Sequence, residues 1–495
     1  MQSNQAWFER SLPWVMRLLW GAALFTLPVT SFRYFPGMGD STLVRPLAFY
    51  PAALLMVLIG LQVWRGGQAS LPRTGIWVPL VAFLACLVGA SFFGAVLDPL
   101  PLRGQEYWGR VLRAWVTVGI GLSFFMAAVW MNRTEADVRF TVRWLLAGLV
   151  MNMVWSGVQA LAFYTPLLDK VTVTYWQRAF SMRELVRTNR VSGMAFEPAW
   201  LAGQLATVYL PWLIAALLTR VRVTRFKAYE LLLLGGACLL LLATYSRGGL
   251  VTALMAVALT VLVAGRAELR SAWQWFMARG WALRAGVTVL AAGVLVGAGV
   301  FLSQKDYFSR LFTTEADSLE EFIIENSAGA RAAYTFGALG AYEDSPWLGV
   351  GLGASGFYIY DHLPDWAMTT VPEIAKQFSP ENRLYPNPKN MYARLLAESG
   401  IFGFFLFLAF QLALLAEALV ALQRREVFAR FLGVAGLCAW LAIVMYNATQ
   451  DSFATPNLWI NLGVLAGVMA GWGQRPEAGE QGSAESEAGL TSLSN

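Results

Sequence analysis

Three arginines that lie far apart in the chain could each bind a phosphate group. Arg190, Arg247 and Arg331 all stand in or beside polar stretches that interrupt apolar sequence. A guanidinium group can grip a phosphate with paired hydrogen bonds. Arg247 is flanked by apolar runs, where an arginine is costly unless it faces a partner or a water-filled cavity. The alternative for Arg247 is an arginine that extends toward lipid headgroups, and for Arg331 it is a solvated place on a helix surface.

A carboxylate and a lysine stand where two polar connections enter apolar runs. Glu197 precedes Pro198, which suits the first turn of a helix, so a place at the helix N-terminus already explains Glu197. Its functional alternative is a general base, or an arginine partner, at the mouth of a cavity. Lys389 and Asn390 put a cation and an amide at the second entry. Capping the helix is the more common use of such an asparagine.

The connection 166–196 has a basic excess. Its cationic residues are Lys170, Arg178, Arg183, Arg187 and Arg190. An anionic ligand would explain this excess, and a solvated helix face explains it equally well.

Other polar features indicate little chemistry. His362 is the one histidine in the sequence, and a single histidine in a long polar connection is more often incidental than catalytic. Residues 351–356 match G-x-G-x-x-G, but no βαβ pattern surrounds them, so we interpret these glycines as a turn that packs closely against helices. The three cysteines lie in apolar runs without metal-ligand spacing, so we expect no disulfide and no metal site.

Membrane helices must position these side chains. The chain of 495 residues is 57% apolar and 14% charged, against about 25% charged in an average soluble protein. This composition predicts an all-α, polytopic integral membrane protein. The net charge of +6 is then better explained by the membrane topology than by an affinity for nucleic acid. We expect about twelve spans, near residues 12–30, 43–64, 76–97, 110–131, 144–165, 197–219, 228–245, 248–265, 282–302, 395–422, 428–447 and 456–473.

The placement of basic residues predicts the orientation. The short connections that are rich in arginine and lysine alternate along the chain, and include Arg73, Lys227 and Arg424, so all of them are expected to be cytoplasmic. Both termini are then cytoplasmic, and the long connections 166–196 and 303–394 face the periplasm in a bacterium. Because both flanks of 228–265 are basic, the chain must turn back near residues 244–249.

The predicted organisation has four parts. Residues 1–302 form the first nine spans, 303–394 a large periplasmic segment, 395–473 the last three spans, and 474–495 a disordered cytoplasmic tail. Within the large segment, the pattern from Glu320 to Tyr342 predicts one amphipathic helix, which carries Arg331. No cleavage pattern follows the first apolar run, so we expect no removable signal peptide.

Taken in order, four short motifs resemble the O-antigen ligase and O-antigen polymerase family of bacterial membrane glycosyltransferases. They are Arg190-x-x-Gly193 with Glu197-Pro198, Ser246-Arg247-Gly248-Gly249, residues 346–353 (PWLGVGLG), and Asn390 followed by residues 398–403 (ESGIFG). The resemblance implies a protein of the bacterial inner membrane with a polyprenyl-diphosphate-linked glycan as donor. It also implies metal-independent transfer without a cofactor, with Arg190, Arg247 and Arg331 on the diphosphate.

One position departs from that family. Its ligases have a histidine, the expected base, immediately before the asparagine, whereas this chain has Lys389. A lysine of ordinary pKa is a poor base near neutrality, so Lys389 suits diphosphate binding better, and Glu197 becomes the preferred base. This departure favours a polysaccharide polymerase that extends O-antigen, capsule or exopolysaccharide, and weakens a lipid A-core ligase.

Two rivals remain beside the polymerase, apart from a non-enzymatic membrane scaffold. A ligase that joins the glycan to lipid A-core or to a protein shares the donor site and differs in the acceptor. A transporter also has many spans, but carriers usually show repeat symmetry and ionisable residues near the bilayer centre. Here most spans lack ionisable residues well inside them, and no repeat symmetry between the halves is evident. The expected partners are the lipid-linked donor, a glycan acceptor and the bilayer, with a flippase and a chain-length regulator as candidate partner proteins.

Overall fold

The computed structural model describes residues 2–34, 44–65, 75–186, 189–226, 228–304, 309, 318–326, 328–379, 381–382 and 384–472. Arg73, Arg187, Lys227 and the tail that was expected to be disordered lie outside the described residues. Within them the chain is helical and forms no β-strand, only two isolated β-bridges, which confirms the all-α prediction.

In the part of the chain that is described, a helix occupies each predicted apolar run. These are α1 (Gln2–Thr26), α2 (Phe49–Trp64), α3 (Trp77–Val96), α4 (Tyr107–Met131), α5 (Glu135–Tyr164), α7 to α8 (Pro198–Thr219), α9 (Tyr229–Ala243), α10 (Arg247–Ala264), α12 (Trp281–Ser303), α19 (Met391–Gln423), α20 (Val427–Tyr446) and α21 (Ile460–Trp472).

Length and composition support membrane crossing for some of the twelve expected spans. Among the described residues, eight helices are long and apolar enough, namely α3, α4, α5, α7 to α8, α10, α12, α19 and α20. The apolar helices α2 and α9 have 16 and 15 residues. At about 1.5 Å per residue these extend only about 24 Å, which is less than the roughly 30 Å of a hydrocarbon core.

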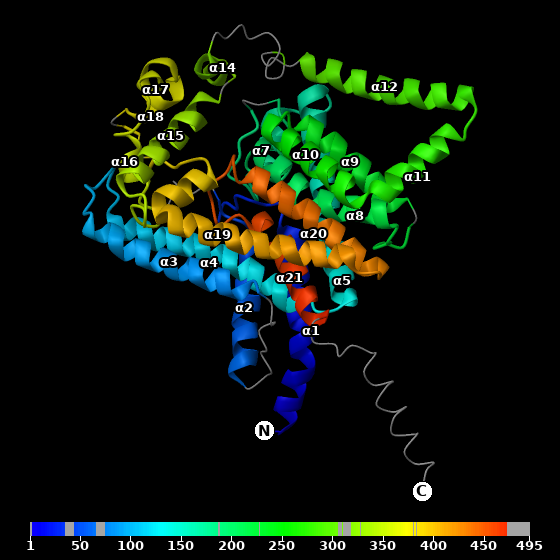
Figure 1. Ribbon diagram of the computed structural model, residues 1–495, viewed down its shortest axis with the longest axis horizontal. Coiled ribbons are helices and arrows are strands. Elements are labelled where there is room, and N and C mark those ends of the chain that lie inside the picture. Colours follow the sequence, from blue (N-terminus) through cyan, green and yellow to red (C-terminus); the bar gives the residue numbers. More distant parts are fainter. Residues whose placement is uncertain are drawn as a thin grey trace, which may run out of the picture.

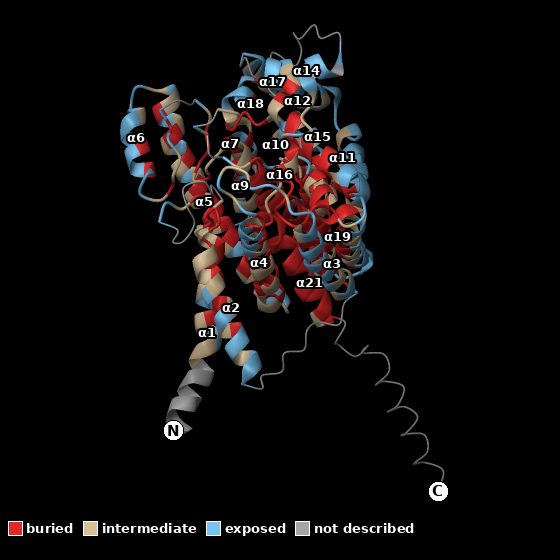
Figure 2. Cartoon of the chain, turned by 90° about the vertical axis from the view of Figure 1, so that its left-hand side faces the viewer, coloured by how far each residue is buried: buried red, intermediate tan, exposed pale blue. Residues whose placement is uncertain are grey.

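Most residues of α20 and α21 are buried in the bundle. Figure 1 shows α3, α4, α19 and α20 running roughly alongside one another, and Figure 2 shows most buried residues in this central region. Small residues allow the close approach of these helices. A Cβ atom at Gly467 of α21, for example, would lie only 2.5 Å from the carbonyl oxygen of Asn132 at the end of α4.

Helix α12 differs, because it stands apart from the bundle in Figure 1. No residue of its segment Trp281–Val300 is buried. An apolar helix of this length with exposed side chains suits a surface that faces lipid.

The large polar segment between α12 and α19 contains short helices. These are α14 (Leu319–Glu325), α15 (Gly329–Asp344), α16 (Gly356–Ile359), α17 (Asp365–Thr370) and α18 (Pro372–Gln377). The prediction of one helix from Glu320 to Tyr342 was therefore wrong. Helix α14 ends at Asn326, whose ψ of 15° lies outside the helical range, and Asn326 Oδ1 accepts a hydrogen bond from Arg247.

Hydrogen bonds join the connecting segments in two sets, and each set contains segments that the sequence predicts on the same side of the membrane. In one set, Met182 donates from its backbone nitrogen to Ser31 O at 3.2 Å, and Arg103 donates to Asn382 O at 2.7 Å. In the other, Arg143 donates to Val223 O at 2.7 Å. We call the end of the bundle that carries the first set the site end, because Arg190, Arg247 and Arg331 lie there too.

Candidate functional site

A short turn between α9 and α10 forms one side of the site. Helix α9 ends at Ala243 and α10 begins at Arg247, so the chain reverses in the predicted region. Tyr245 in the turn has a φ of 48°. Arg190 supports this turn, since its guanidinium donates to the carbonyl oxygens of Thr244 and Tyr245 at 3.0 and 3.2 Å.

Arg247 ties this turn to the large polar segment. It is half-buried, and its Nη1 donates to Asn326 Oδ1 at 2.8 Å while Nη2 donates to the carbonyl oxygen of the same residue. Arg247 therefore spans from the start of α10 to the end of α14.

The connection 447–455 between α20 and α21 brings Arg331 to the same place. Arg331, in the first turn of α15, is exposed and donates from Nη1 to Thr449 O. A Cβ atom at Gly248, the residue after Arg247, would lie 3.7 Å from Thr449 Cγ2. Thr449 thus lies between the two arginine-bearing helices.

Glu197 is a carboxylate at the start of α7. It is half-buried and occupies the N-cap position without a side-chain capping bond. Its carboxylate accepts no hydrogen bond from any described residue. Burial lowers the pKa of Arg183, and the nearby Glu197 carboxylate raises it. Glu197 and Arg331 both act electrostatically on Tyr446 at the end of α20, so their charges lie in one region.

Lys389 and Asn390 lie at the start of α19. The Asn390 side chain accepts from Tyr392 N and Ala393 N at 2.9 and 3.2 Å. Asn390 therefore caps the helix, which is the more common use of an asparagine at this position. Lys389 has a φ of 60°, and its backbone nitrogen donates to Asp451 Oδ2 at 3.0 Å.

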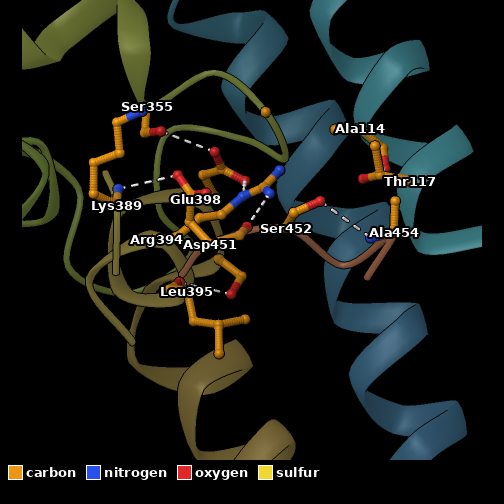
Figure 3. Close-up of polar contacts among 12 residues, drawn as sticks. Ala114, Thr117, Ser355, Lys389, Arg394, Leu395, Glu398, Asp451, Ser452 and Ala454 are labelled. Carbon is orange, nitrogen blue, oxygen red and sulfur yellow. Dashed lines mark hydrogen bonds and ion pairs between the residues drawn. The ribbon is translucent and has the colours of Figure 1, made fainter. Parts of the chain in front are cut away.

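Sequence reasoning missed a buried charged cluster beside Lys389 (Figure 3). Arg394 Nε donates to Glu398 Oε2 at 2.9 Å, and Ser355 Oγ donates to Glu398 Oε1 at 2.8 Å. Arg394 Nη1 also donates to Asp451 O at 2.5 Å. The available signal was an arginine and a glutamate one helical turn apart in an apolar run, which membrane helices rarely carry without a role.

Residues 349–353 pack closely, as their interpretation predicts. Gly349, Gly351 and Gly353 have φ values of 71°, 100° and 80°. A Cβ atom at Gly351 would lie 2.1 Å from Tyr107 Oη. These glycines therefore allow the backbone to approach the membrane helices. Among the residues with a described structure, no β-strand of a dinucleotide-binding fold flanks them.

His362 lies away from the arginines. Its Nε2 is 3.2 Å from Asp344 Oδ2 at the end of α15. Arg331 is thirteen residues earlier on that helix, which is about 20 Å at a rise of about 1.5 Å per residue. The ring therefore contacts Asp344 within the polar segment.

The assembled groups suit an anion with a reacting hydroxyl beside it. Arg190, Arg247 and Arg331 come from three separate parts of the chain and all lie at the site end, with Glu197 as a nearby carboxylate. Among the residues that are described, no group of three or more His, Cys, Asp or Glu side chains could hold a metal ion. The three cysteines are free.

Residues 231–408 match the family model for the O-antigen ligase (Wzy_C). No curated protein matches the chain. The matched range contains Arg247, Arg331, Lys389 and the Arg394–Glu398 pair. Arg190, Glu197 and Asp451 lie outside it.

Proposed function

We propose, on the premise that residues 231–408 belong to the O-antigen ligase family, that this protein polymerises lipid-linked oligosaccharide repeat units. It transfers the growing glycan from its polyprenyl diphosphate to a sugar hydroxyl of the next unit. The reaction takes place on the periplasmic face of the bacterial inner membrane.

The observation that supports this proposal best is that Thr449 accepts a hydrogen bond from Arg331 and lies beside Gly248, the residue after Arg247. In the transfer, the bond between the sugar and the diphosphate breaks, and negative charge develops on the leaving diphosphate. Guanidinium groups that are already in place stabilise such charge without reorganisation. Arg190, which braces the turn before Arg247, adds a third cation to the same region.

Glu197 is the proposed general base, which takes the proton of the acceptor hydroxyl. Glu398 is less suited to that role, because Arg394 and Ser355 already occupy both of its carboxylate oxygens. Glu197 accepts no such bond from the described residues and has a nearby cation in Arg183. Lys389 serves as a further diphosphate contact, since a lysine side chain offers several hydrogen-bond donors to a phosphate.

A ligase that uses the same donor is the second candidate, and the description of the matched family favours it. Polysaccharide from cells that lack the protein separates the two functions when lipid-linked and released glycan are examined separately on gels. Single repeat units on the usual acceptor, with long chains missing, support the polymerase. Full-length chains that accumulate on the polyprenyl carrier contradict it and support the ligase.

The transfer is proposed to be independent of metal ions, with arginines in the role that a cation plays in many glycosyltransferases. Transfer by the purified protein in lipid nanodiscs should then continue in excess EDTA. Loss of activity that is restored by Mg²⁺ would contradict this part of the proposal.

A further inference from the structure

Gln159 of α5 holds the loop that carries Arg190 and Glu197. The side chain is fully buried. Its Oε1 accepts from Ser192 N and Gly193 N at 3.0 and 2.8 Å. Its Nε2 donates to Gly193 O and to Gln177 Oε1 at 2.7 and 2.6 Å.

The loop has an unusual shape at Gly193. Its φ is +56°, and a Cβ atom there would lie 2.3 Å from Asn152 Oδ1. That Asn152 oxygen also accepts from Met194 N at 2.9 Å. Two side-chain amides of α5 thus hold three consecutive backbone units, midway between Arg190 and Glu197.

The amide of Gln159 is matched to this task. Two backbone N–H groups of the loop need an acceptor and one carbonyl needs a donor, and only a side chain with both can serve them together. An apolar side chain would fill the same space but would leave these buried groups unpaired, which is unfavourable for each group. A polar side chain in a membrane helix is itself costly unless it is fully bonded.

We propose that Gln159 is a positioning residue for glycan transfer, which orients Arg190 toward the diphosphate and Glu197 toward the acceptor hydroxyl through the backbone of residues 192–194. This inference rests on the proposed function. Gln159 does not touch the substrate, so its loss should lower kcat and leave the KM for the lipid-linked donor nearly unchanged. A misplacement of about 1 Å can lower a rate on the order of 100-fold.

The test uses Gln159→Glu in the full-length protein in nanodiscs. A protonated glutamic acid can still accept from the loop and donate to Gly193 O, whereas an ionised one cannot donate. All hydrogen-bond partners of Gln159 are uncharged, and burial raises the pKa of a carboxyl. The variant should therefore be active at low pH and lose activity as pH rises, while the wild-type protein shows no such loss over the same range.

Gln411→Glu is the matched control. Gln411 is also a buried glutamine in a membrane helix, and its Oε1 has no hydrogen-bond partner among the described residues. Its variant should show no comparable pH-dependent loss. The same loss in both variants would overturn the proposal, because it would indicate a general effect of a buried carboxyl.

Hydrogen exchange of residues 190–197 separates this inference from the proposed function. In Gln159→Leu these amides should exchange faster than in the wild-type protein, and unchanged exchange would overturn the inference. If exchange rises while transfer stays normal, the inference also fails. The Arg190→Ala variant then tests whether Arg190 takes part in the proposed function. An inactive Arg190→Ala leaves the proposed function standing, whereas an active one removes Arg190 from it.

Discussion

The guanidinium of Arg394 lies 2.9 Å from the carboxylate of Glu398, one turn further along α19, and both side chains are almost fully buried. This pair joins three separate parts of the chain. Glu398 accepts from Ser355 of the glycine-rich stretch, and Arg394 donates to Asp451 of the connection between α20 and α21. Because Asp451 also accepts from Lys389, the pair supports the backbone around the proposed diphosphate site.

Removing one partner of this pair should destabilise the protein strongly. Glu398→Ala leaves a buried guanidinium without its carboxylate, which typically costs about 3–5 kcal/mol. Unfolding of the purified protein in detergent measures the loss. Glu135→Ala is the control, since the pair of Glu135 with Arg139 is partly exposed and such pairs contribute only about 0–1 kcal/mol. Equal stability of the two variants would contradict the prediction.

Arg247→Ala should abolish chain extension while the protein level in the membrane stays unchanged. The variant lacks the guanidinium that the proposal puts on the diphosphate. Arg247→Lys should retain only part of the activity, because an ammonium group cannot form paired hydrogen bonds with a phosphate. The gel profile of polysaccharide measures both.

Arg270→Ala serves as the control for Arg247, since Arg270 is an exposed arginine on α11 (Arg266–Met277), the helix after α10. It should give polymer of wild-type length. Polymer of normal length from Arg247→Ala would defeat the assignment of Arg247 to the donor site.

Glu197→Gln should stop transfer because an amide cannot accept the proton of the acceptor hydroxyl. Glu197→Asp keeps a carboxylate but shortens its reach, so it should be slower than the wild-type protein and faster than the glutamine variant. Initial rates with a purified lipid-linked donor test this order. Glu343→Gln, at an exposed position of α15, should keep wild-type rates, and a fully active Glu197→Gln would exclude Glu197 as the base.

Arg103 should hold the polar segment against the bundle. It donates to the backbone carbonyl oxygens of Gln377, Asn382 and Leu384. Arg103→Ala should therefore increase limited proteolysis between residues 372 and 390. Arg113→Ala is the control, because Arg113 donates locally, to Gln105 Oε1, and its side chain bonds to no other described residue. Equal cleavage of both variants would show that Arg103 is not needed for this attachment.

The sequence by itself determined features with local causes. Runs of apolar residues predicted where the helices lie, because a helix in lipid must carry a continuous apolar surface. The glycines after Arg247 and the basic residues on both sides of the region predicted the reversal between α9 and α10. Asn390 was weighed correctly as a cap, since its partners, Tyr392 N and Ala393 N, are only two and three residues away.

The tertiary structure decided which distant groups meet. Asn326 at the end of α14 bonds to Arg247, 79 residues earlier, and no local pattern contains that partner. Likewise, the periodicity of α5 does not reveal that Gln159 bonds to Gly193, 34 residues further on. Arg394 and Glu398 are visible in the sequence as a pair, but their link to Asp451 depends on where the connection after α20 folds back. Hydrogen bonds between distant segments follow from packing, and packing is a property of the whole chain.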